Sequence, residues 1–237
     1  QDLSSACCCA SDARPTPLVI IPHMRERSLT PLDRLLAGVN NALRTVSAPA
    51  GRPARENPAA DVSEGTLDDR ERAHAAGLMR INHAGEVAAQ GLYQGHAAVA
   101  RDKSIEQQMQ RAADEEFDHL AWCEERLTEL GAAPSRLSPF WYAGGFAIGA
   151  ASGVLGDRWS LGFIAETEKQ VCDHLEDHFE RLPKDDARSR AILERMHEEE
   201  AEHGENAIDA GAAELPPPVK RLMQLTAKVM TRTAYWV

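Results

Sequence analysis

The chain has 237 residues, which fits one domain with a tail or one large helical bundle. Its net charge of −11 argues against nucleic acid as a main partner, because a phosphate backbone binds basic surfaces. Its five cysteines do not predict a disulfide framework, since Cys7, Cys8 and Cys9 are contiguous. Cys123 and Cys172 lie on apolar helical stripes, so we expect them in a core, in a reducing compartment, rather than as ligands.

Residues 1–65 are predicted to form a flexible N-terminal extension and linker with one short amphipathic helix. The first 22 residues have no helical period and no long apolar run, so they do not predict a signal peptide. We expect the natural chain to start at Met24, with residues 1–23 as added or processed sequence. The amphipathic helix that follows has these apolar positions: Leu29, Leu32, Leu35, Leu36, Val39 and Leu43. Residues 48–64 are rich in Ala, Pro, Gly and charge, which predicts the linker.

Residues 66–237 are predicted to form one all-helical domain. Thr66 is the expected N-cap of its first helix, with Asp69 adding negative charge to the first turn. Gly131 and Gly211 are expected to close the second and fourth helices. The third helix is expected to end near Leu182. The other predicted helices span 67–99, 104–130, 185–210 and 219–235. No segment has a convincing strand pattern.

The segment at 137–156, LSPFWYAGGFAIGAASGVLG, has no charged residue over a length that could span a membrane. A simple span is not favoured, because the segment holds five glycines, two serines and a proline and leads directly into the next bundle helix. Gly145, Gly149 and Gly153 are spaced at four, which predicts the close approach of two helices. No strand precedes them, so a dinucleotide-binding loop is not supported. Whether this segment inserts into lipid is left open.

Four aromatic residues begin this segment and predict an exposed apolar patch that contacts lipid or an apolar substrate. They are Phe140, Trp141, Tyr142 and Phe146. The last predicted helix, 219–235, alternates apolar residues with lysine and arginine, so it is compatible with an interfacial helix or with packing on the bundle.

The helices carry two Glu-x-x-His pairs, each preceded by a lone glutamate about thirty residues upstream. In chain order the six residues are Glu86, Glu116, His119, Glu168, Glu200 and His203. Residues three apart on a helix lie about 60° apart with a rise of about 4.5 Å, so the Glu and His of a pair reach one point. Each of the six lies on an apolar stripe and is therefore expected to face a core.

Four carboxylates facing one core must be protonated, paired or bound to metal, and two divalent cations balance four negative charges. One Glu from each of two helices and Glu-x-x-His from each of two others is the ligand set of ferritin-like bundles. Oxygen and imidazole ligands without thiolate favour iron or manganese. The predicted fold is therefore an all-α, ferritin-like four-helix bundle with a long apolar crossover and additional terminal helices.

Other residues of the same types fit this site less well. The pair Glu194 and His197 lies on a polar stripe, which predicts a solvated face, and Glu166 is likewise expected to point to water. His74 follows Glu71 on an acceptable stripe, but it lies twelve residues, about 18 Å, before the lone glutamate of its own helix. It is therefore too distant to share that centre.

The runs RINHAGEVAAQGLYQG, DEEFDHLAW and EEEAEHGENA, together with the apolar segment, resemble the demethoxyubiquinone hydroxylase family of ubiquinone biosynthesis over 67–237. The resemblance implies a di-iron monooxygenase, with two Fe ions, that uses O2 to hydroxylate a polyprenylated methoxy-methyl-benzoquinol. The family's metal ligands fall on the same six residues. A further family histidine matches His174, which implies a role beside the ligands or in proton and electron movement. The alternative for His174 is an ordinary histidine at a helix edge.

Two other classes remain open on this sequence: a ferritin-like iron-storage or peroxide-handling protein, and a membrane-docked scaffold of a quinone-synthesis complex. The electron donor is also open, with NADH, the quinol itself and a partner protein as candidates. Expected partners are the polyprenylated quinol, O2, a membrane surface and other quinone-biosynthesis proteins. The expected location is peripheral, on the cytoplasmic face of a bacterial inner membrane, with the matrix side of the mitochondrial inner membrane as the alternative. Tail length and oligomeric state are not predicted.

Overall fold

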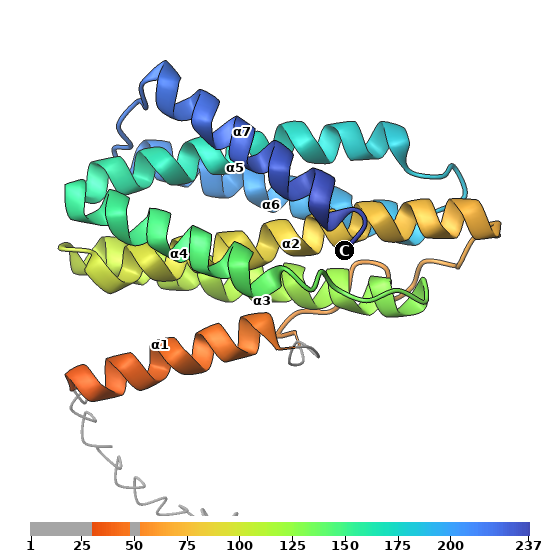
Figure 1. The fold of residues 1–237 in the computed structure, drawn as a ribbon, viewed down its shortest axis with the longest axis horizontal. Helices are drawn as coiled ribbons and strands as arrows, with labels where there is room; N and C mark the ends of the chain where they lie inside the picture. Colours follow the sequence, from red (N-terminus) through yellow and green to blue (C-terminus); the bar gives the residue numbers. More distant parts are fainter. Residues whose placement is uncertain (1–29, 48–52) are drawn as a thin grey trace, which may run out of the picture.

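The structure, a computed structural model, describes residues 30–47 and 53–237 (Figure 1). Within them it contains seven α-helices and no strand, which confirms the all-α prediction. The helices are α1 Pro31–Val46, α2 Asp69–Val99, α3 Lys103–Glu129, α4 Ser138–Leu155, α5 Asp157–Arg181, α6 Ala187–Asp209 and α7 Pro217–Ala234. The cysteine run at 7–9 and the start predicted at Met24 lie outside the described residues.

Helices α2, α3, α5 and α6 form a four-helix bundle, as predicted. α2 packs along α3, and α5 packs along α6, so the bundle consists of two hairpins. α4 connects the hairpins and packs along α2, while α7 crosses the outside of α2 and α5 (Figure 1). α1 is not one of the four bundle helices but lies against them, in contact with α2 and α4.

The start of α2 differs from the prediction. Its N-cap is Asp68 rather than Thr66. The Asp68 carboxylate accepts hydrogen bonds from the backbone N–H groups of Arg70 and Glu71, and the Glu71 side chain accepts one from the Asp68 N–H. This reciprocal capping box gives partners to N–H groups of the first turn. Thr66 lies two residues earlier and is too far along the chain to cap the same groups.

Helix α4 approaches α2 closely through glycines on both helices, as the spacing of Gly145 and Gly149 predicted. Gly91 and Gly95 on α2 face them, and a Cβ at any of the four would collide with the backbone of the other helix. Gly156, with φ of 124°, then turns the chain into α5. None of the helices in the described residues is both long and apolar enough to cross a membrane.

The predicted aromatic patch on α4 is only half correct. Phe140 is 71% exposed and Phe146 37%, but Trp141 is partly buried and Tyr142 is 8% exposed. Tyr142 lies on the face that packs against α2, where its hydroxyl donates to Gln94 Oε1 at 2.6 Å. The apolar surface continues instead along the outer face of α4 through Ile148, Val154 and Leu155.

The bundle has two main apolar clusters, one on each side of a layer of acids and histidines. The first contains Leu78, Met79, Trp122, Leu127, Leu175, Ile192 and Met196. The second contains Leu92, Tyr93, Met109, Leu161, Ile164 and Ala207. On each bundle helix the candidate ligands lie between members of the two clusters, so apolar packing closes the polar layer from both ends.

Candidate metal centre

Each bundle helix contributes to the buried polar layer. α2 supplies Glu86, α5 supplies Glu168, and α3 and α6 each supply a Glu-x-x-His pair. All six side chains predicted as ligands are buried. The apolar stripes that predicted their direction are therefore buried with them, including Leu193 and Met196 on α6.

Four of the six come together tightly. Ligand atoms of Glu86, Glu116, His119 and Glu200 all lie within 4.8 Å of one another. His119 Nδ1 lies 3.2 Å from Glu116 Oε2, 3.1 Å from Glu200 Oε1 and 3.8 Å from Glu86 Oε2. Three carboxylates and one imidazole nitrogen thus converge on one point from three helices.

The other two lie on the far side of the same carboxylates. His203 Nδ1 lies 3.1 Å from Glu116 Oε1 and 3.5 Å from Glu200 Oε2. Glu116 and Glu200 therefore lie between the two histidines, each turning one oxygen toward either ring. Burial and the charges of Glu200 and Glu116 raise the pKa of Glu168, and the charge of His203 lowers it in part. Glu168 Oε1 accepts a 2.6 Å hydrogen bond from the hydroxyl of Tyr93.

The electrostatics of the layer demand positive charge. Burial, and then the neighbouring carboxylates, raise the pKa of both Glu86 and Glu168 well above its usual value. Burial alone lowers the pKa of His203, but the adjacent carboxylates of Glu116 and Glu200 raise it to about 12. The pKa values of two of the acids, Glu86 and Glu168, and of both histidines are thus raised, whereas the histidines hold the pKa of Glu116 low against the effect of burial. Both effects favour positive charge in the layer, and so favour bound cations.

Several buried atoms of the layer have no hydrogen-bond partner among the described residues. They are Glu116 Oε1, Glu168 Oε2, Glu200 Oε2 and His203 Nδ1. Unpartnered buried polar atoms are rare because they lose water without a replacement. Lone pairs left free on three carboxylates and one imidazole fit metal ligands, and the donors, oxygen and nitrogen without thiolate, suit iron or manganese.

Two further carboxylates, which the sequence analysis did not single out, hold the outer nitrogens of the histidines. His119 Nε2 donates to Glu199 Oε2 at 2.6 Å, and His203 Nε2 donates to Glu115 Oε2 at 2.6 Å. Glu115 precedes Glu116 on α3 and bonds to His203 on α6, whereas Glu199 precedes Glu200 on α6 and bonds to His119 on α3. The doubled glutamate in both motifs, EE-x-x-H, was the available signal.

The remaining candidates lie elsewhere. His174 packs against His178, with ring centroids 4.0 Å apart, and no contact joins it to the six side chains within the described residues. His74 bonds to the Tyr235 hydroxyl and to the Arg181 carbonyl oxygen, away from the layer, as the distance argument required.

The prediction for Glu166 is wrong. It is buried rather than pointing to water, because α7 crosses over it and brings Lys220 Nζ to 3.4 Å. Sequence periodicity within α5 could not show that a later helix covers this face. Glu194 is exposed and His197 partly so, in agreement with the solvated face expected for that pair.

A bundle with one glutamate on each of two helices and Glu-x-x-His on each of the other two is the architecture of the ferritin-like carboxylate metal proteins. Within that class, the family model described as "Ubiquinone biosynthesis protein COQ7" matches residues 73–234. The chain belongs to this family.

Curated relatives match over nearly their full length, and each is named 3-demethoxyubiquinol 3-hydroxylase. The protein of Nitrosococcus oceani is 53% identical over 90% of this chain and 100% of its own. That of Alcanivorax borkumensis is 54% identical over 90% of this chain and 99% of its own. That of Xanthomonas oryzae pv. oryzae is 55% identical over 89% and 96%.

Proposed function

We propose that the chain is a 3-demethoxyubiquinol 3-hydroxylase, a monooxygenase of ubiquinone biosynthesis. Similarity over nearly the whole length of proteins with that name supports the assignment. The observation that carries it is the buried layer in which Glu86, Glu116, His119 and Glu200 bring ligand atoms within 4.8 Å. A carboxylate and imidazole cluster of this kind suits iron, which would supply the O2 chemistry of such a hydroxylase.

We further propose that the layer holds two iron ions. His119 and Glu86 would complete one position, and His203 and Glu168 the other, with Glu116 and Glu200 shared between them because both lie between the two rings. Bound iron would supply the activation of O2. Glu115 and Glu199 are not among the proposed ligands. They accept the Nε2 protons of the two histidines and so fix both imidazoles with Nδ1 toward the carboxylates of the layer.

The chain's own part in the reaction is to exclude water and hold these side chains. The two apolar clusters close the polar layer at both ends, so the carboxylates lie in a medium where their charges interact strongly. Tyr93 keeps one oxygen of Glu168 occupied and leaves the other, Oε2, free. The oxidative chemistry belongs to the metal, while positioning belongs to the bundle.

We also propose that the protein docks on a membrane, where a quinol with an apolar tail resides. The outer face of α4 exposes five large apolar side chains: Phe140, Phe146, Ile148, Val154 and Leu155. α7 exposes Leu222, Leu225 and Val229 beside basic residues, a composition suited to anionic lipid headgroups. Figure 1 shows α4 and α7 on the same side of the bundle. The cytoplasmic face of a bacterial inner membrane is the proposed location.

The test is turnover by the purified full-length protein after anaerobic loading with Fe(II). On addition of O2 and demethoxyubiquinol, with and without NADH, we expect about two irons per chain and a quinone product heavier by one oxygen. The Glu116→Ala variant should lose both. Ferric iron accumulating without product would instead indicate storage, and metal-independent assembly with other proteins would indicate a scaffold.

A further inference from the structure

The segment before α2 lies against the bundle, and we call residues 53–65 the N-terminal strap. The Ala54 N–H donates to Asp118 Oδ1 at 2.7 Å, and Asn57 Nδ2 donates to Glu125 Oε2 at 2.7 Å. Ala59 is fully buried in the first apolar cluster. Glu64 bonds to Arg126 at 2.6 and 3.0 Å. In sequence, the strap precedes the residues matched by the family model, 73–234. In space, it runs alongside α3 (Figure 1).

Arg55 is the strap residue that reaches furthest toward the metal centre. Its Nε donates to Asp118 Oδ2 at 2.6 Å, and its Nη1 donates to Glu199 Oε1 at 2.5 Å. Its guanidinium also lies over the ring of Trp122, 5.0 Å from the centroid. Asp118 is on α3 and Glu199 on α6, so one guanidinium joins the two helices that carry the Glu-x-x-His pairs.

The other oxygen of Glu199 completes a path to the ligands. Glu199 Oε2 accepts the His119 Nε2 proton at 2.6 Å, and His119 Nδ1 faces Glu116 and Glu200. A carboxylate on the outer nitrogen of a metal-binding histidine fixes its tautomer and the direction of its ring. Arg55 fixes that carboxylate in turn.

The carboxylate that holds the second histidine has no such support. Glu115, which holds His203, has a side chain 49% exposed against 8% for Glu199, and no arginine pairs with its carboxylate in the part of the chain that the structure describes. Arg55 reaches Glu115 only at the backbone carbonyl oxygen, at 3.4 Å, which does not fix the side chain. Arg195 also pairs with Glu199 at 2.5 Å. It lies four residues away on the same helix, however, so it cannot hold Glu199 relative to α3.

We propose that Arg55 is a positioning residue for one of the two metal positions: by holding Glu199 against His119, it makes that position depend on the N-terminal strap while the position at His203 does not. The proposal rests on the metal centre of the proposed function, and not on the identity of the substrate.

The experiment is an anaerobic titration of the full-length protein with Fe(II), in which calorimetry measures each binding event. Mössbauer spectroscopy is then recorded on the loaded protein. The variants His119→Ala and His203→Ala first identify which binding event belongs to which position. In Arg55→Ala we expect the His119 event to weaken by about tenfold to a hundredfold, with an altered quadrupole doublet for that iron only. Arg55→Lys keeps the charge but loses the planar fork, so its effect should be intermediate.

Arg188→Ala is the matched control. Arg188 donates to the Val62 carbonyl oxygen at 3.1 Å and pairs with Glu129, so this change loosens the other end of the strap without touching Glu199. It should leave both binding events unchanged. Equal weakening of both events in Arg55→Ala, or an equal effect of Arg188→Ala, would overturn the proposal, as would unchanged binding in the folded Arg55→Lys variant. Two bound irons without quinol turnover would contradict the proposed substrate and leave this result standing.

Discussion

At the scale of single residues, the layer is organised by what holds its ligands. Both histidines are held at the outer nitrogen by a carboxylate of the opposite helix, and Glu168 is held by the Tyr93 hydroxyl at 2.6 Å. Among the described residues, no hydroxyl or amide group donates a hydrogen bond to Glu86 as Tyr93 does to Glu168. Because a hydrogen bond to a charged partner is stronger than one between neutral groups, each of these supports should have a measurable effect.

Tyr93→Phe tests one of them. The change keeps the buried ring and removes only the hydroxyl, so Glu168 loses the donor on Oε1. We expect metal binding at the His203 position to weaken by about tenfold, measured by anaerobic Fe(II) titration. Tyr142→Phe is the control, since that hydroxyl donates at the same distance, 2.6 Å, to the neutral amide of Gln94 outside the layer. Equal effects of the two changes would show that a lost hydroxyl, not a loosened ligand, is responsible.

The burial of the six candidate ligands could be predicted because each lies on an apolar stripe of its own helix, a property that one helix shows by itself. The role of Glu115 and Glu199 could not, because it depends on α3 and α6 lying side by side. Glu166 was wrongly predicted to point to water for the same reason, since its contact with Lys220 comes from a later helix, α7. Periodicity gives the direction of a side chain within its helix but not which other helix it meets.

At the scale of helices, termination signals and glycine spacing predicted most of the fold. Gly131 and Gly211 have φ of 72° and 96° and follow the ends of α3 and α6, as expected. The N-terminal strap could not be predicted, because its composition is that of a linker and its order comes from partners such as Asp118 and Arg126. The domain boundary placed at residue 65 stays a prediction.

Two adjacent glycines of α4 provide a sharp test of helix packing. Gly145 faces the α2 backbone at Ala88 and Leu92, whereas nothing lies within 4 Å of a Cβ at Gly144. We expect Gly145→Ala to lower the free energy of unfolding by about 2 kcal/mol through overpacking. Gly144→Ala should raise it by about 0.5–1 kcal/mol, because alanine loses less backbone entropy in a helix. Urea unfolding measures both, and equal signs would contradict the close approach of α4 to α2.

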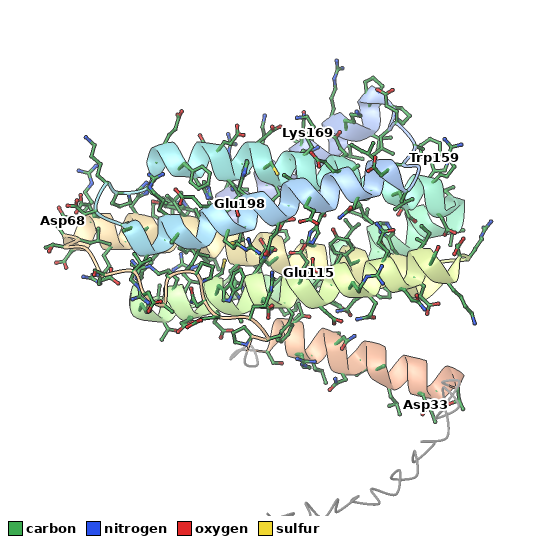
Figure 2. The ribbon with its side chains drawn as sticks, turned by 180° about the vertical axis from the view of Figure 1, so that it is seen from behind. Asp33, Asp68, Glu115, Trp159, Lys169 and Glu198 are labelled. Carbon is green, nitrogen blue, oxygen red and sulfur yellow. The ribbon has the colours of Figure 1, made fainter. Side chains whose placement is uncertain are left out.

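At the scale of the whole molecule, the apolar face of α4 lies away from α6, which Figure 2 shows on the opposite side of the bundle. The double change Phe140→Asp with Leu155→Asp should reduce binding to anionic vesicles by about tenfold or more, because two large apolar side chains no longer enter lipid. Iron content should not change. Ile208→Asp on α6 is the control, since its side chain is 62% exposed, similar to 71% and 67% for the other two. Flotation measures binding, and undiminished flotation of the double variant would sink the docking proposal.

The whole fold should also depend on metal in a way that pH reveals. In the folded chain, burial and neighbouring carboxylates raise the pKa of Glu86 and Glu168 well above that of the unfolded chain. As pH rises, the unfolded chain therefore loses these protons first, and the free energy of unfolding falls.

We expect the chelator-treated protein to lose thermal stability steadily as pH rises from about 5, just above the ordinary pKa of a glutamate, through the neutral range. The iron-loaded protein should not, because bound cations keep the same carboxylates ionised and paired. Glu86→Gln removes one of the acids without changing its size, so it should stabilise the chelator-treated protein at the upper end of this range and flatten its pH dependence. The same variant should bind iron more weakly at the His119 position. Opposite signs for stability and metal affinity in this variant would show that Glu86 serves the metal and opposes folding without it.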